Sequence, residues 1–381
     1  MTIFVFYQSQ YHTTMETRVK DIVKAMELLS PTLYAEDFDN VGLLVGSPSS
    51  IVTGILIAHD CTEMVVDEAI EKGANVIVAF HPIIFNGLKR LTGSTYVERA
   101  VMKAIRHDIA IYAIHTALDN SWEGVNEGMC RALGLKDKKI LIPQKNTLYR
   151  LTTYVPSSHT DAVRTALAAA GAGSIGDYDS CSWIVRGTGR FRGKEGANPY
   201  VGSIGQLHSE EEDIINVVLP AHLKSTVINH LLTSHPYEEP AYEIVALENK
   251  NHRIGMGMIG HLPMAMEEKE FLELVRDTFD ARGIRHSSFT GKKIKKVAVL
   301  GGSGSFAIGS ARRAGADAFI TADLKYHDYF AAEGDILLAD IGHFESERFT
   351  KNILWDYISE KFTNFAVCLS DIDTNPINYL Q

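Results

Sequence analysis

Histidines and carboxylates follow four apolar, strand-like runs of this chain, and these residue types can hold a metal ion. In chain order they are His81, then His115 with Asp119, then Asp323 with His327, then His343 with Glu347. Ligands of open parallel sheets bind outside the carboxyl ends of the strands, so we expect these side chains to share one edge of a sheet. Imidazole and carboxylate donors suit zinc, manganese or iron without any thiolate. The pattern therefore predicts a divalent-metal site.

The segment GHFESE at 342–347 strengthens this interpretation. His343 and Glu347 are four residues apart, so both side chains project to one face if a helix begins there. A glutamate also has two oxygens and can bridge two ions. The alternative is structural: Glu345 and Glu347 could simply complement the dipole of a helix start. A single histidine at a strand end is likewise more often a packed or surface residue than a ligand.

A second signal is GGSGS at 301–305, between an expected strand and an expected helix. Consecutive glycines there can form a backbone nest that cradles an anion. The loop is also weakly similar to a dinucleotide-binding turn, which would make the protein an oxidoreductase. That reading needs an isolated acidic residue about 20 positions further on. Asp323 stands there, but in a histidine-containing loop, so a tight strand-to-helix turn is the simpler alternative.

A third signal is SHPYEEPAYEI at 234–244. Its carboxylates, Glu238 and Glu239, could contact a ligand or a partner. The alternative is a proline-bounded loop that enters an edge strand, with no binding role.

The elements that must position these residues alternate between strands and helices along the first part of the chain. The expected helices span 16–29, 63–73, 94–108 and 122–134, and the expected strands span 54–60, 74–80 and 109–115. Such alternation is typical of βαβ units and a parallel sheet. From about residue 290 the same rhythm returns, with a strand and turn at 295–305, strands at 317–323, 335–340 and 365–370, and helices at 306–316 and 345–362.

Between residues 147 and 250 the order of expected elements is instead β-α-β-β-α-β, which is that of a ferredoxin-like sandwich. We therefore predict an α/β domain in two halves, interrupted by an α+β insert. The predicted division is an N-terminal extension at 1–14, a first half at 15–146, the insert at 147–250 and a second half at 251–381.

The composition limits the classes of function. The chain has 381 residues, of which 45% are hydrophobic and 22% charged, with a net charge of -10. An acidic chain gains nothing from counterion release, which makes nucleic acid an unlikely partner. Four cysteines without a CxxC pair are typical of a reducing cytoplasm. No apolar run approaches the roughly 18 residues of a membrane span, and the N-terminus lacks the pattern of a secretory signal.

Six stretches occur in an order that resembles the Nif-three-like family, also called GTP cyclohydrolase I type 2 homologues. They are DFDNVGLLVG (37–46), the HP step at 81–82, HTALDN (115–120), HPYEEPAY (235–242), ADLKYHD (322–328) and GHFESE (342–347). The resemblance covers about residues 16–381, and the insert resembles the PII/CutA-like domain of the longer bacterial members. It implies a two-half α/β domain assembled into a homohexamer, with metal sites that face an inner cavity.

The resemblance also implies that the protein binds two divalent ions, and it implies which residues would bind each ion. One ion would take His81, Asp119 and Glu347. The other would take His343 and Glu347, together with a histidine at position 80. This chain has Phe80 there, so we expect one well-held ion and a weaker second. His59 ends the neighbouring strand, but a side chain one strand away can point to the other face.

The expected function is that of a metal-dependent hydrolase. A bound divalent ion supplies hydroxide at neutral pH, and His115 or His327 would act as acid or base. The family name suggests a nucleotide-like substrate, and a phosphoester is an equal candidate; GGSGS or Lys89 and Arg90 could meet its phosphates. The alternative is a metal-binding or metabolite-sensing assembly without catalysis, regulated through its PII-like insert.

Overall fold

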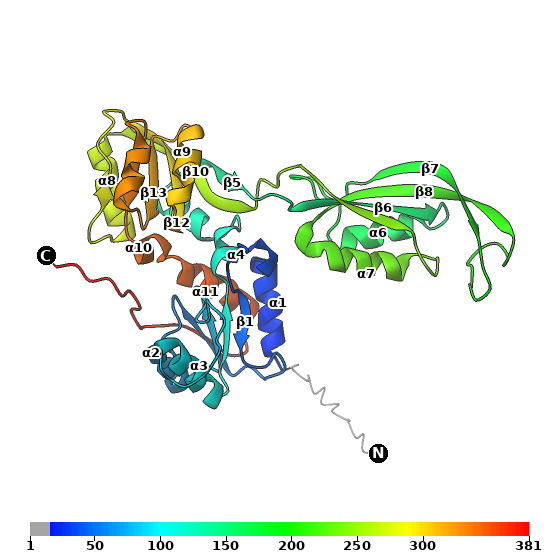
Figure 1. Cartoon of the computed structure of the whole chain (residues 1–381), viewed down its shortest axis with the longest axis horizontal. Coiled ribbons are helices and arrows are strands. Elements are labelled where there is room, and N and C mark those ends of the chain that lie inside the picture. Colours follow the sequence, from blue (N-terminus) through cyan, green and yellow to red (C-terminus); the bar gives the residue numbers. More distant parts are fainter. Residues whose placement is uncertain (1–15, 381) are drawn as a thin grey trace, which may run out of the picture.

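The computed structural model describes residues 16–380 and contains two sheets of an α/β type, with a third sheet carried on a long insert (Figure 1). The N-terminal extension at 1–14 lies outside the described residues. Over the part of the chain that the structure covers, no helix combines the length and the apolar character needed to cross a bilayer.

The first sheet has five strands in the order β1-β4-β3-β2-β15. The N-terminal elements are α1 (Val19–Leu29), η1 (Thr32–Tyr34), β1 (Gly42–Val45), β2 (Gly54–Ala58), α2 (Glu63–Glu71), β3 (Val76–Ala79), α3 (Tyr96–Arg106), β4 (Ala110–Ala113), α4 (His115–Asp119), α5 (Val125–Ala132) and β5 (Lys136–Pro143). Strands β2, β3 and β4 run parallel, as predicted. They are buried along their whole length, which explains their continuous apolar sequences.

The second sheet has six strands in the order β11-β14-β13-β12-β10-β5. Its elements after the insert are β10 (Gly255–Met266), α8 (Glu268–Phe279), β11 (Arg285–His286), β12 (Ile294–Ser303), η3 (Ser305–Ala307), α9 (Ile308–Arg313), β13 (Ala318–Ala322), η4 (Tyr326–Ala332), β14 (Leu337–Asp340), α10 (His343–Glu347), α11 (Thr350–Lys361) and β15 (Ala366–Leu369). Each sheet takes a strand from the other half of the sequence, since β15 pairs with β2 and β5 pairs with β10.

The insert carries a four-stranded antiparallel sheet in the order β7-β8-β6-β9 and projects away from the other two sheets (Figure 1). Its elements are β6 (Leu148–Pro156), α6 (Thr160–Ala169), β7 (Trp183–Arg192), β8 (Leu207–Pro220), η2 (Ala221–Leu223), α7 (Lys224–Ser234) and β9 (Tyr242–Ala246). Alternate strand residues such as Leu151 and Ile215 form a core with Val163 and Val227 of the helices. The other face of the sheet is more exposed, and Trp183 on that face is 71% exposed to solvent.

The helix predicted over 345–362 is two helices, because the chain turns at Arg348 and Phe349. No proline or glycine marks this break. Tertiary contacts accompany it: the Arg348 guanidinium donates to the Phe279 carbonyl, and the Thr350 hydroxyl lies 3.2 Å from His59 Nδ1. The break leaves Glu347 as the last residue of the short helix α10, where its side chain is buried.

Candidate metal centre

The ends of β2 and β3 place two histidines side by side. Ala58 and Ala79 are register partners in these parallel strands, and the His81 amide donates to the His59 carbonyl at 3.0 Å. The ring centroids of His59 and His81 lie 4.7 Å apart. Both rings therefore stand at the carboxyl edge of the first sheet, where the sequence predicted the site.

Glu347 brings its carboxylate from α10 into the centre of this group. Its Oε2 atom lies 3.3 Å from His59 Nε2, 3.4 Å from His81 Nε2 and 3.3 Å from His343 Nε2. Its side chain is 2% exposed, and Oε2 has no hydrogen-bond partner within the described chain. His59, His81 and Glu347 offer ligand atoms that all lie within 4.8 Å of one another. We call His59, His81, His343 and Glu347 the cluster.

The remaining ring nitrogens of the cluster are held by neighbouring oxygens. His81 Nδ1 donates to Asp60 Oδ1 at 2.8 Å, and His343 Nδ1 donates to Asp323 Oδ2 at 2.7 Å. A carboxylate can only accept, so Nδ1 carries a proton in both rings, and Nε2 faces Glu347. Metal-bound histidines commonly show this arrangement, in which the outer partner fixes the ring and its tautomer.

The charges of the cluster shift its pKa values strongly. Burial lowers the pKa of His81, but the carboxylates of Asp60 and Glu347 outweigh burial and raise it to about 9. For His343, burial is likewise outweighed by Asp323 and Glu347, and the pKa rises to about 11. Burial alone would raise the pKa of Glu347, yet the three imidazoles hold it well below its usual range. The carboxylate is therefore ionised and available as a ligand.

Asp119 lies at the end of α4, and its carboxyl group is buried beside the cluster. Burial and the charge of Glu347 raise its pKa well above the usual value, while His81 and His343 act in the opposite direction. Its Oδ1 atom has no hydrogen-bond partner among the described residues. An orphaned buried carboxylate oxygen near His81 and His343 fits a metal ligand, and so does the orphaned Oε2 of Glu347. The donor set therefore fits a divalent ion.

The two histidines predicted to act as acid or base lie in different surroundings. His115 begins α4, with its ring centroid 5.0 Å from that of His81, and its Nδ1 donates to Asp39 Oδ1 at 2.9 Å. His327 lies exposed on η4 against Tyr326 and Phe330. In the described chain no hydrogen bond or ion pair joins His327 to the cluster, so the structure brings only His115 to the site.

The expectation that His59 points away from the site was wrong. Because Ala58 pairs with Ala79, the next residues, His59 and Phe80, lie on the same face of the sheet. Their rings stack with centroids 5.5 Å apart, and Phe80 is fully buried. His59 thus supplies an imidazole beside the position where the family resemblance implied a histidine. Aligning the ends of the two parallel strands would have revealed this from the sequence.

The glycine turn at 301–305 packs against the cluster instead of forming an open nest. A side chain at Gly302 would collide with Glu347 Oε1. The Gly301 amide donates to Asn126 Oδ1 at 3.1 Å and the Gly302 amide to Ser346 Oγ at 2.9 Å. These amides therefore already donate hydrogen bonds to side chains, and the absence of a side chain at Gly302 leaves space for the Glu347 carboxylate.

Lys89 and Arg90, the other groups predicted to meet a phosphate, lie exposed in a loop, with no ion pair among the described residues.

A cavity of about 690 Å³ opens onto the cluster. Its walls include Arg285 and the C-terminal segment with Asn375 and Tyr379, none of which the sequence pattern had singled out. The Arg285 guanidinium pairs with the buried Asp340 carboxylate, and its side chain is 64% exposed. The cavity has the size of a small-molecule site, with imidazoles and carboxylates at one end and a cation at its wall.

Comparison with known proteins identifies similar chains over nearly the whole length. The model of the family Duf34/NIF3 (NGG1p interacting factor 3) matches residues 17–376. A "GTP cyclohydrolase 1 type 2 homolog" of Halalkalibacterium halodurans is 39% identical over 364 residues, which cover 94% of this chain and 98% of that protein. A protein of the same name from Bacillus subtilis is 36% identical, with 95% and 98% covered.

The solved structures agree with this result. A Bacillus cereus protein described as related to NIF3 superposes with a TM-score of 0.84 at 38% sequence identity. The match covers 96% of this chain and 99% of that one. A Staphylococcus aureus protein, SA1388, gives a TM-score of 0.75 at 30% identity, with 96% and 99% covered. Because each match covers nearly the whole of both chains, these relatives share the overall fold of this chain.

Proposed function

This chain belongs to the Duf34/NIF3 family, and we propose that it is a divalent-metal-dependent hydrolase acting on a nucleotide-like or phosphorylated substrate. One observation supports this most: the buried Oε2 of Glu347 faces three imidazole Nε2 atoms at 3.3–3.4 Å, at the end of a cavity large enough for a metabolite. The names of the relatives agree with a hydrolytic reaction on a nucleotide, and GTP itself is one candidate.

His59, His81 and Glu347 would hold the well-bound ion, since only their ligand atoms come mutually within 4.8 Å in the described chain. His343 and Asp119 flank this set and would bind a weaker second ion together with Glu347. Zinc, manganese and iron all suit imidazole and carboxylate donors. When bound, such an ion lowers the pKa of a coordinated water and so supplies hydroxide at neutral pH.

The protein's own residues would then position the substrate and move protons. His115 is oriented by Asp39 and lies beside His81, so its Nε2 can hold or release a proton next to the cluster. The Arg285 guanidinium at the cavity wall can bind a phosphate oxygen. Asp340 fixes the direction of that guanidinium, because it accepts from one of its nitrogens.

The test is hydrolysis of GTP and of a panel of phosphoesters, with the metal-free protein and after addition of Mn²⁺, Zn²⁺ or Fe²⁺. We expect turnover only with metal, and loss of turnover in Glu347→Gln. Tight metal binding without turnover on the whole panel would instead favour a metal-binding or metabolite-sensing assembly. A second cavity in the insert, far along the chain from the cluster, is the observation that keeps this second function open.

The resemblance supports three further proposals. The insert at 147–250 would be a ferredoxin-like, PII/CutA-like domain between halves at 15–146 and 251–381; its strand order β7-β8-β6-β9 and its two helices agree with this. The chain would assemble into a homohexamer. It would act in the cytoplasm, in keeping with its free cysteines.

A further inference from the structure

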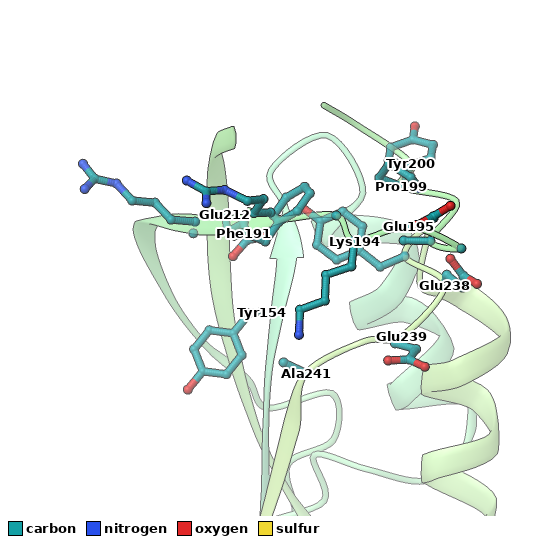
Figure 2. A pocket seen from close by; sticks show the side chains of 17 residues that line it. Tyr154, Phe191, Lys194, Glu195, Pro199, Tyr200, Glu212, Glu238, Glu239 and Ala241 are labelled. Atoms are coloured by element: carbon teal, nitrogen blue, oxygen red, sulfur yellow. The ribbon is translucent and has the colours of Figure 1, made fainter. Parts of the chain in front are cut away.

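We propose that the insert binds a small zwitterionic metabolite, one that carries a protonated nitrogen and an anionic group, in a pocket on the more exposed side of its sheet. The pocket has a volume of about 620 Å³ and is enclosed by the end of β7, the loop that follows it, and the loop that leads into β9 (Figure 2). This proposal concerns a different site from the cluster and does not depend on hydrolysis there.

Two loops build the pocket, and they are tied together. The amide of Asn198, in the loop after β7, donates to Glu238 Oε2 at 2.9 Å, in the loop before β9. The Tyr200 hydroxyl lies 3.4 Å from His159 Nε2, at the start of α6. Aromatic rings of Tyr154, Phe191 and Tyr200 stand around the space (Figure 2), and Tyr237 also lines it. These walls favour an organic ligand over a bare ion.

Glu212 places a carboxylate on one side of this space. It is 8% exposed, and it forms no ion pair within the described chain. The Tyr237 hydroxyl donates to its Oε1 at 2.8 Å, which fixes the carboxylate and leaves Oε2 without a cation. Burying an unpaired carboxylate is costly, so a cationic or strongly donating ligand is the chemistry that would stabilise this largely buried group.

The sequence of β7 makes room for that carboxylate. Gly187 is the register partner of Glu212, and a side chain at Gly189 would collide with both carboxylate oxygens. Glycine weakens a strand interior, and it often marks a place where a ligand or another group must come close. The glycine at position 189, directly against one buried carboxylate, is therefore consistent with a built site.

Lys194 supplies the opposite charge. It follows the end of β7, forms no ion pair among the described residues, and extends its ammonium group into the pocket between Tyr154 and Glu239 (Figure 2). Glu212 and Lys194 lie too far apart to form an ion pair with each other, since their charged atoms are not within 4.0 Å. A ligand with a charge at each end would satisfy both. Arg190 and Arg192 also line the pocket, but a polyphosphate would bring several negative charges next to the carboxylates of Glu195, Glu212 and Glu239. A ligand with a single negative charge therefore fits better.

Ligand-observed NMR and calorimetry on the metal-loaded full chain test the proposal. The probes are the proteinogenic amino acids and phosphoethanolamine, each at millimolar concentration, with putrescine as a cation-only probe and succinate as an anion-only probe. We expect at least one zwitterion to bind, and neither single-charge probe to bind as tightly. Binding of putrescine or succinate alone, or no binding of any zwitterion at 10 mM, about the weakest affinity of interest, would overturn the proposal.

Variants then locate the bound probe. Glu212→Gln keeps the shape and the contact with Tyr237, and it should weaken the probe's affinity at least tenfold, about what one charge-assisted hydrogen bond contributes. The control Glu211→Gln changes an exposed neighbour on the other face of β8 and should leave affinity unchanged. Lys194→Met, on an exposed side chain, should also weaken binding, while Lys250→Met should not. Unchanged affinity in both Glu212→Gln and Lys194→Met would contradict the assignment.

Discussion

At the scale of single residues, Glu347 connects the histidines of the proposed metal site. Its Oε2 atom is the common neighbour of three imidazoles from β2, β3 and α10, and a glycine turn leaves room for its other oxygen. Among the described residues, no other carboxylate has three imidazole nitrogens at this distance. Loss of this one oxygen donor should therefore affect the metal more than any other single change.

We predict that Glu347→Gln weakens the tightest metal site by on the order of 100-fold, because an amide carbonyl is a much poorer ligand than a carboxylate. The measurement is competition with a chromogenic chelator. Glu360→Gln, an exposed glutamate on α11, serves as the matched control and should bind metal as the unmodified protein does. Equal affinity in the two variants would exclude Glu347 as a ligand.

His59 gives the second residue-scale prediction. His59→Ala should weaken the tight ion by on the order of 100-fold, since it removes one of the three groups whose ligand atoms converge. The control is His107→Ala, an exposed histidine after α3. If His59 only packs against Phe80, the variant will lose stability in thermal unfolding but keep its metal affinity, and the assignment of His59 will be wrong.

Phe80→His is the complementary change. The Phe80 ring lies 5.0 Å from the ring of His81 and 5.6 Å from that of His115, so an imidazole there would stand next to the cluster. We expect the second ion to bind more tightly, seen as a second step in a metal titration. We also expect a loss of roughly 3 kcal/mol in the free energy of unfolding, because a fully buried aromatic side chain is replaced by a polar one. A single unchanged binding step would refute the role given to position 80.

At the scale of elements, the C-terminal segment after β15 closes one side of the cavity. The Thr374 hydroxyl donates to Asp60 Oδ2 at 2.7 Å, and Asp60 in turn holds the ring of His81. We predict that removing residues 374–381 weakens metal binding by roughly tenfold, because Asp60 loses a partner that orients it. Far-ultraviolet circular dichroism should show that the fold is retained, since β15 and α11 remain. Unchanged metal affinity would show that the segment takes no part in the site.

Much of the element scale could be predicted from the sequence. Buried parallel strands such as 54–58 are continuous apolar runs, and the insert's strands and helices appear in the predicted order. Strand β10 was not predicted, because glycines and Pro263 interrupt its pattern. The exchange of β5 and β15 between the sheets could not be foreseen either, since pairing of distant strands leaves no local pattern. The same holds for the site. The histidines at the strand ends were evident from the sequence, but the contact of His59 with Glu347 could be predicted only with the register of the strands.

At the scale of the whole molecule, the insert projects away from the two sheets that carry the proposed metal site (Figure 1). Light scattering tests the proposed assembly: a homohexamer should have six times the chain mass of 42.1 kDa. A monomer at micromolar concentration would contradict that proposal. It would leave the proposed metal site unaffected, because all residues of the cluster come from one chain.

The measurement that tests the central claim most directly is the number of metal ions per chain, by elemental analysis of purified protein combined with calorimetric titration of the metal-free form. We predict one tightly held divalent ion per chain at the cluster and a second that binds more weakly. That result would support a site built by His59, His81 and Glu347 with Phe80 in place of a further imidazole. A chain that retains no ion, or two ions of equal affinity, would contradict it.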